Sequence, residues 1–198
     1  VDLSKKEQFS PEFLAIAPNG RMPAIVDPDG PDGKPIAIFE SGAILQYLGN
    51  KTGWFYPVEQ RQCTDVEQWL YWQMSALGPV AGQAHHFRKF APEKVPYGIR
   101  RYTDESNRLY GVLNQRLSLV PWLAGPYSIA DMAVWPWLVH ADWQGQSVAD
   151  FPALSRWYQA MQSRSAVTAA WAAYPTREIA PEDYEVLLNQ RADALKPS

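Results

Sequence analysis

The chain has 198 residues, of which 46% are apolar, so it is long enough for one large domain or two small ones. Nine Trp, ten Tyr and seven Phe residues supply ample material for a buried core, which excludes intrinsic disorder over most of the length. The formal net charge is −3 and there is no basic block, which argues against a nucleic-acid partner. The longest apolar run, residues 132–139, is less than half of the ~20 residues that cross a bilayer, so we expect no membrane partner.

The cysteine count predicts a cellular location, and the first residues predict that a segment is missing before them. Cys63 is the single cysteine, so no disulfide can form within the chain, and no secretory signal pattern opens it. Both features predict a reducing, cytoplasmic location. Residues 1–3 are typical of the end of a strand, so we expect a strand and a helix that would precede them to be missing.

Residues 1–53 predict a small α/β domain that begins with a short helix. Ser10 is a favourable N-cap and Pro11 a favourable first helical residue. The helix is expected to stop at the Asn-Gly pair of residues 19–20, which is typical of a helix end or a turn.

A hairpin and a second helix are expected to complete this domain. Residues 23–26 and 36–39 are short β runs, and the connection between them is rich in Asp, Pro and Gly, which predicts two antiparallel strands. Ser41 is then expected to cap a helix that ends near residue 53.

Residues 61–198 predict an all-α domain that follows an aromatic linker at residues 54–57. Apolar side chains recur at helical spacing over residues 63–77 and 102–117, which predicts two long amphipathic helices. Ser128 and Asp131 have the spacing of a capping box, and the apolar residues 132–139 after it predict a buried helix.

Two more helices are expected toward the C-terminus. One begins at residues 151–154 and buries Trp157, Tyr158 and Met161. The stretch after Pro175 is expected to hold one last surface helix.

Most motifs for phosphate, metal and nucleophile chemistry are absent from the sequence. His85 and His86 are adjacent rather than four residues apart, and His140 is the only other histidine, so we expect no metal site. The pair is interpreted as a helix end that faces solvent or a cleft. Cys63 is interpreted as a packing residue rather than a catalytic thiol.

One constellation points to a ligand. Ser41 at a helix N-terminus suits a carboxylate, and the neighbouring Glu40 suits an ammonium group, so the pair fits the α-amino-acid head of a γ-glutamyl peptide. Pro23 at the start of a strand is compatible with a cis peptide bond, and the backbone of Met22 would then pair with an extended peptide. From the residues alone, the alternative in which Ser41 is a simple cap and Pro23 a turn residue stays open.

The motifs together resemble the glutathione transferase superfamily over the chain up to about residue 172. The resemblance rests on Met22-Pro23-Ala24-Ile25-Val26, Glu40-Ser41-Gly42-Ala43-Ile44-Leu45 and the box formed by Ser128 and Asp131. Features typical of the Nu-class, nitrogen-regulator-like branch, which contains disulfide-bond oxidoreductases, are Pro11-Glu12-Phe13-Leu14, Trp69-Leu70-Tyr71-Trp72-Gln73, Gly78-Pro79, Gly82-Gln83, His86-Phe87 and Arg101-Tyr102.

This resemblance implies a fold and a set of glutathione contacts. The fold would be a truncated thioredoxin-like N-terminal domain followed by an all-α domain, in a homodimer. Glu40 and Ser41 would hold the γ-glutamyl head, and Met22 would pair with the cysteinyl part beside cis-Pro23. Gln8 would approach the glycine end. Arg101 would supply a cation to a glutathione carboxylate, with a solvated helix-face arginine as an equally open interpretation.

The resemblance also implies an activity. Reduced or oxidised glutathione would be the co-substrate, without a metal, and the thiolate of bound glutathione would attack a small disulfide or an electrophile. No residue of this chain matches the thiol-activating position of the family, because the segment that carries it is expected to be missing, so the catalytic residue is unknown. The alternative is a glutathione-binding regulatory protein without catalysis on the same fold.

Overall fold

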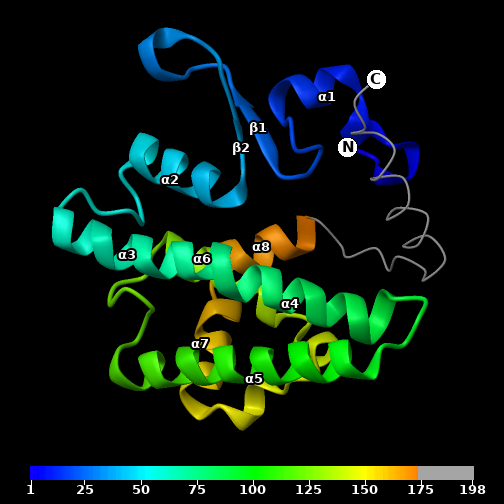
Figure 1. Cartoon of the computed structure of the whole chain (residues 1–198). Helices are drawn as coiled ribbons and strands as arrows, with labels where there is room; N and C mark the ends of the chain where they lie inside the picture. The colour runs from blue at the N-terminus through cyan, green and yellow to red at the C-terminus, as the bar shows by residue number, and fades with distance from the viewer. Residues whose placement is uncertain (174–198) are drawn as a thin grey trace. The chain divides into compact units, whose positions relative to one another are not determined.

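The computed structural model describes residues 1–173, and these form two compact units, residues 1–52 and residues 53–173 (Figure 1). The surface helix expected after Pro175 lies outside the described residues. Within the described part, no helix combines the length and the apolarity that a membrane span requires.

The first unit contains short elements on either side of a two-stranded sheet. They are η1 (Leu3–Lys5), η2 (Glu7–Phe9), α1 (Pro11–Ile16), β1 (Ala24–Asp27), η3 (Pro31–Gly33), β2 (Ile36–Phe39) and α2 (Ser41–Thr52). Ser10 caps α1, because its hydroxyl accepts the Phe13 N–H at 3.2 Å and Pro11 occupies the first turn, as predicted.

The predicted hairpin is present. β1 and β2 are antiparallel, with Ala24 opposite Phe39 at one end and Asp27 opposite Ile36 at the other. Both α1 and α2 contact both strands, so the half-buried side chains of Ile25 and Ile38 lie in a small core between sheet and helices.

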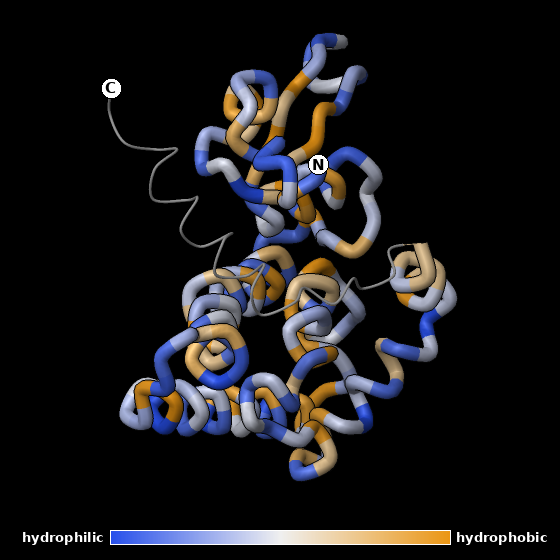
Figure 2. The backbone as a smooth tube through the Cα atoms, turned by 90° about the vertical axis from the view of Figure 1, so that its right-hand side faces the viewer, coloured by the Kyte–Doolittle hydropathy of each residue, from blue (hydrophilic) through white to orange (hydrophobic). Residues whose placement is uncertain are grey.

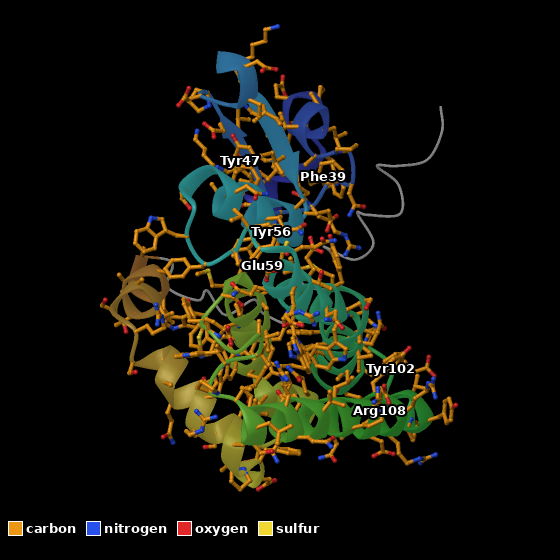
Figure 3. The ribbon with its side chains drawn as sticks, turned by 90° about the vertical axis from the view of Figure 1, so that its left-hand side faces the viewer. Phe39, Tyr47, Tyr56, Glu59, Tyr102 and Arg108 are labelled. Carbon is orange, nitrogen blue, oxygen red and sulfur yellow. The ribbon has the colours of Figure 1, made fainter. Side chains whose placement is uncertain are left out.

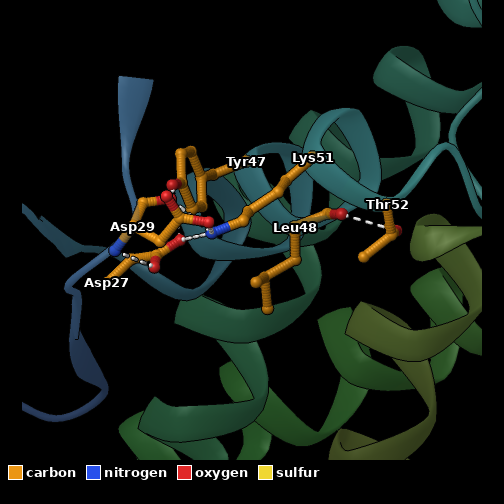
Figure 4. Close-up of polar contacts among 6 residues, drawn as sticks. All are labelled: Asp27, Asp29, Tyr47, Leu48, Lys51 and Thr52. Carbon is orange, nitrogen blue, oxygen red and sulfur yellow. Dashed lines mark hydrogen bonds and ion pairs between the residues drawn. The ribbon is translucent and has the colours of Figure 1, made fainter. Parts of the chain in front are cut away.

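A polar cluster joins the far end of this hairpin to α2 (Figure 4). The Tyr47 hydroxyl donates to Asp27 Oδ2 at 2.6 Å, and Lys51 Nζ donates to the same oxygen at 2.5 Å. Lys51 also donates to the Asp29 carbonyl oxygen at 2.5 Å. Three hydrogen bonds from two side chains of α2 thus fix the turn end of the hairpin against the helix.

The prediction that Ser41 caps α2 is wrong by one position. The carbonyl oxygen of Glu40 accepts the first helical hydrogen bond, from Ile44 N–H at 2.9 Å, so Glu40 takes the N-cap position and Ser41 is the first helical residue. The cause is the left-handed backbone of Glu40, with φ at 70°, which turns the chain into the helix directly after β2.

The second unit is helical. Its elements are α3 (Gln60–Trp72), the π-helical segment η4 (Gln73–Leu77), α4 (Gly78–His85), the π-helical segment η5 (His86–Phe90), α5 (Pro96–Leu119), α6 (Ile129–Leu138), η6 (Ala141–Gln144), η7 (Val148–Asp150), α7 (Pro152–Gln162) and α8 (Ser165–Ala173). Hydrophobic and hydrophilic residues alternate along the longer helices of this unit, as the colours of Figure 2 show.

The two long helical stretches predicted for residues 63–77 and 102–117 are present, the second as part of α5. At Trp72 α3 passes into the π-helical turn η4, and α4 follows it, while the backbone stays in the right-handed helical region throughout. Pro79 accounts for this turn, because it has no backbone N–H to bond the carbonyl of Ser75 one turn earlier.

The core of the second unit lies around α6. The predicted capping box is present: the Ser128 side chain accepts the Ala130 N–H, and Asp131 accepts the Ser128 N–H at 3.0 Å. α6 is largely buried, as predicted, although Pro136 is exposed. Of the three residues expected to be buried on α7, Trp157 and Met161 are buried, while Tyr158 is half-buried and stacks on Trp135.

Candidate functional site

The hairpin register brings the two halves of the predicted site to one place. Ala24 and Phe39 form the last pair of the sheet, and the next residues beyond this pair are Pro23 on one chain and Glu40 on the other. Directly paired residues in antiparallel strands lie only about 5 Å apart. Met22, Pro23, Glu40 and Ser41 therefore gather at the same end of the hairpin.

The Met22–Pro23 step leads into β1 through a cis peptide bond, as the sequence suggested. Both residues are exposed, Met22 to 47% of its surface. Met22 and Pro23 precede β1 and lie outside the β1–β2 pairs. The exposed backbone groups of such residues can pair with an extended peptide.

Glu40 presents an exposed carboxylate from a strained backbone. A residue with a Cβ rarely adopts a φ of 70°, and such strain is found where the surrounding structure holds the residue in place. Glu40 is the single residue between the end of β2 at Phe39 and the start of α2 at Ser41. It therefore has no freedom to relax, and its position relative to the helix is fixed.

Ser41 and the first turn of α2 provide a site for an anion beside the negative charge of Glu40. Ser41 is half-buried at the start of a 12-residue helix. The first N–H groups of an α-helix have no acceptor inside the helix, and together with the helix dipole they attract an anion. A carboxylate at this helix end and an ammonium group beside Glu40 are what one α-amino-acid head would provide.

Gln8 carries an unused acceptor. Only 3% of the residue is exposed, and the described residues offer no hydrogen-bond partner to its Oε1. Buried side-chain polar atoms are normally bonded, so an orphaned oxygen is a candidate ligand contact. Gln8 lies in η2, and a Cβ at Gly20, two residues before Met22, would lie 3.4 Å from the Gln8 carbonyl oxygen.

Arg101 lies in the second unit, on the exposed side of α5. It borders an open pocket of about 340 Å³ lined by Tyr97, Arg100, Arg101, Asp104, Glu105 and Arg108. Figure 3 shows Arg108 projecting from α5; its guanidinium bonds the Glu105 carboxylate at 2.7 and 2.9 Å. The neighbouring Tyr102 stacks on Phe87 at a ring separation of 5.5 Å. Arg101 thus lies among side chains of both charges, and its role stays a prediction.

His85 is the last residue of α4, which continues directly into the π-helical segment η5, and it is half-buried. Its ring meets the Trp143 ring edge-on at 5.6 Å, and Gln144 Nε2 lies 3.1 Å from His85 Nε2. Gln144 Nε2 also donates to the Trp137 carbonyl, so it is the donor to His85, whose Nε2 accepts. Burial, with His140 as a second cause, lowers the pKa of His85 to about 4.

The other polar candidates form no metal centre. The part of the chain that the structure describes holds no group of three or more His, Cys, Asp or Glu that fits a metal ion. Cys63 is half-buried on α3.

Sequence reasoning missed two features of the structure. One is the contact of Gly20 with η2, for which an Asn-Gly turn pair is the only signal. The other is a pocket of about 220 Å³ in the second unit, whose lining includes Phe55, Tyr56 and Tyr127. The aromatic linker at residues 54–57 is the sequence signal for this pocket, because three of its residues line it. A hydrogen bond from Ile129 N–H to the Phe55 carbonyl oxygen, at 3.0 Å, holds the linker against the start of α6.

Comparisons with known proteins agree with this geometry. The N-terminal domain model of glutathione S-transferases matches residues 1–50, and the C-terminal domain model matches residues 79–165. The disulfide-bond oxidoreductase YfcG of Escherichia coli (strain K12) is 51% identical over 172 residues, which cover 86% of this chain and 80% of YfcG.

Solved structures give the same result. A glutathione transferase from Burkholderia graminis, with two glutathione molecules bound per subunit, has a TM-score of 0.83 at 40% identity and covers 90% of this chain and 77% of its own. A glutathione transferase from Pseudomonas putida, with one glutathione disulfide bound per subunit, has a TM-score of 0.80 at 38% identity, with coverages of 85% and 76%.

The chain therefore belongs to the glutathione S-transferase family. The resemblance drawn from the motifs is confirmed, including its likeness to disulfide-bond oxidoreductases. The predicted fold class, a thioredoxin-like α/β unit followed by a helical unit, is also confirmed.

Proposed function

We propose that this protein is a glutathione-dependent disulfide-bond oxidoreductase whose first unit binds glutathione at the end of the hairpin. The observation that carries the proposal is the meeting of an exposed carboxylate, a helix N-terminus and an exposed backbone step before a strand: Glu40, Ser41 and Met22. A relative that is 51% identical is named a disulfide-bond oxidoreductase, which supports the same chemistry here.

In this proposal each part of glutathione has its own contact. The γ-glutamyl carboxylate binds at the start of α2 by Ser41, and its ammonium group binds Glu40. The cysteinyl part pairs with the backbone of Met22 beside cis-Pro23. Gln8 contacts the glycine end, where its buried oxygen accepts an N–H. Arg101 supplies a cation for a glutathione carboxylate.

Bound in this way, glutathione acts as the nucleophile. Its thiolate attacks one sulfur of a small disulfide, forms a mixed disulfide and releases the other sulfur as a thiolate. A second glutathione thiolate then attacks the glutathione sulfur of the mixed disulfide. The products are oxidised glutathione and the second thiol, and two glutathione molecules have supplied the two electrons. The same thiolate would also attack an electrophilic carbon.

The proposal extends to the organisation of the protein. We propose residues 1–53 as the glutathione-binding domain and residues 61–198 as the helical domain. We also propose a cytoplasmic homodimer, which light scattering checks by giving twice the mass of one chain.

The test is calorimetric titration with reduced and oxidised glutathione. Glu40→Gln keeps the shape and the backbone strain of Glu40 and removes the charge, so it is expected to weaken binding about tenfold or more. Glu12→Gln, at an exposed acidic residue of α1, is the matched control and is expected to bind as the unaltered chain does.

A turnover assay separates catalysis from binding alone. We expect reduction of a small disulfide by glutathione. Binding of glutathione without any turnover would instead identify a regulatory glutathione-binding protein, and absence of binding at millimolar glutathione would refute both.

A further inference from the structure

Gly20 lies where two segments of the candidate site meet. A Cβ at Gly20 would lie 3.0 Å from Cε1 of the Phe9 ring and 3.4 Å from the carbonyl oxygen of Gln8. Carbon atoms in good contact are about 3.5–4.0 Å apart, so a side chain at this position would have to displace the Phe9 ring. The backbone of Gly20 thus forms the surface on which η2 rests.

The conformation of Gly20 also favours glycine. Its φ is +59°, in the left-handed region, and its N–H donates to the Ala17 carbonyl oxygen at 2.8 Å, which closes the turn after α1. Two residues later the chain reaches Met22 and enters β1. A displacement of Phe9 from Gly20 would therefore change the spacing between η2 and the start of this strand.

Gln8 is the residue that such a displacement would move. It is bonded directly to Phe9, it is 97% buried, and its Oε1 has no partner among the described residues. A ligand can use this oxygen only if η2 holds it at a fixed place.

The geometry points to Gly20 as a positioning residue that sets Gln8 against the Met22 step and thereby determines how well the glycine end of glutathione is held. This inference rests on the proposed function. It predicts a specific consequence for ligand choice, because γ-glutamylcysteine lacks the glycine end and does not need Gln8.

Gly33 provides a matched control in the same unit. Its φ is +66°, close to that of Gly20, but a Cβ at Gly33 would have nothing within 4 Å. Gly20→Ala and Gly33→Ala therefore carry the same kind of backbone strain. Only the first of them disturbs η2.

The experiment compares the affinities of the full chain and of both variants for glutathione and for γ-glutamylcysteine. The unaltered chain is expected to prefer glutathione, and Gly20→Ala is expected to lose most of that preference, about tenfold, with γ-glutamylcysteine bound as before. Gly33→Ala is expected to keep the preference. A general loss of stability would lower the affinity for both ligands by the same factor. The ratio of the two affinities therefore reports only how well Gln8 is positioned for the glycine end.

The outcomes are distinguishable. If Gly20→Ala keeps the preference for glutathione, the inference is overturned while the proposed function stands. If the unaltered chain binds no glutathione, both are overturned. Should Gly20→Ala fail to fold, Phe9→Leu removes the ring from the same contact and leaves Gly20 intact. It is expected to lose the preference too, and a retained preference would overturn the inference.

Discussion

At the scale of single residues, Asp27 shows how one carboxylate fixes the turn end of the hairpin, which is opposite the end that carries Glu40. The hydrogen bond from Lys51, followed by that from Tyr47, lowers the pKa of Asp27 from 3.8 to about 2. Because the pKa is lower in the folded protein than in the unfolded chain, the ionised carboxylate stabilises the fold at neutral pH. That contribution is lost as the pH falls from about 4 to about 2.

Asp27→Asn is therefore expected to lower the thermal unfolding midpoint near neutral pH. The difference from the unaltered chain should shrink as the pH falls through the same range, because the carboxylate itself becomes neutral there. Thermal unfolding followed by circular dichroism at several pH values measures this difference. Asp32→Asn, at an exposed carboxylate of the same connection, is the control. A difference that stays constant down to about pH 2 would contradict the assignment.

Residue by residue, the sequence predicted the cis Met22–Pro23 step but not the backbone conformation of Glu40. The types of Glu40 and Ser41 indicated an ammonium and a carboxylate subsite, and the Met-Pro step suggested the cis bond that is present. The left-handed backbone of Glu40 had no local signal, since glutamate is not a residue that favours this conformation. It follows from the direct junction of β2 with α2, which is a property of the packed unit.

At the scale of elements, the start of α6 depends on Asp131. Its Oδ1 accepts from Leu123 N–H at 3.0 Å and from Trp157 Nε1–H at 2.8 Å, and its Oδ2 accepts from Ser128 N–H at 3.0 Å. The side chain thus connects the helix start, the preceding loop and α7. Burial raises the pKa of this carboxyl, and the hydrogen bonds from Leu123, Trp157 and Ser128 oppose that shift.

Asp131→Asn is expected to destabilise the second unit by about 2–3 kcal/mol, because an amide replaces one acceptor oxygen and leaves buried donors without a partner. Urea unfolding followed by tryptophan fluorescence measures the change in the free energy of unfolding. Asp104→Asn, on the exposed side of α5, should leave it nearly unchanged. Equal stabilities of the two variants would refute the role of Asp131.

The sequence predicted the two long helical stretches but not the π-helical turn inside the first of them. The apolar spacing over residues 63–77 continues smoothly past Trp72, and so does the helical backbone, so periodicity gives no sign of the changed hydrogen-bond pattern. Pro79 indicates the turn only in hindsight, because a proline in the first turn of a helix is also a normal helix start. By contrast, the capping box and the hairpin were predicted from local residue types that act within a few positions.

At the scale of the whole molecule, ligand binding and stability are linked. A ligand that binds only the folded protein adds about 2.7 kcal/mol to the free energy of unfolding at one hundred times its Kd. Glutathione disulfide at that excess is therefore expected to raise the thermal unfolding midpoint. Glu40→Gln at the same ligand concentration should show a smaller rise. Identical midpoints with and without the ligand would contradict a glutathione site in the folded chain.

The position of bound glutathione can be seen in a crystal structure of the complex. We expect the γ-glutamyl carboxylate at the first turn of α2, the ammonium group within hydrogen-bond distance of Glu40, and the peptide antiparallel to the backbone at Met22. Glutathione bound in any other place, with Glu40 and the start of α2 facing only solvent, would refute the proposed site.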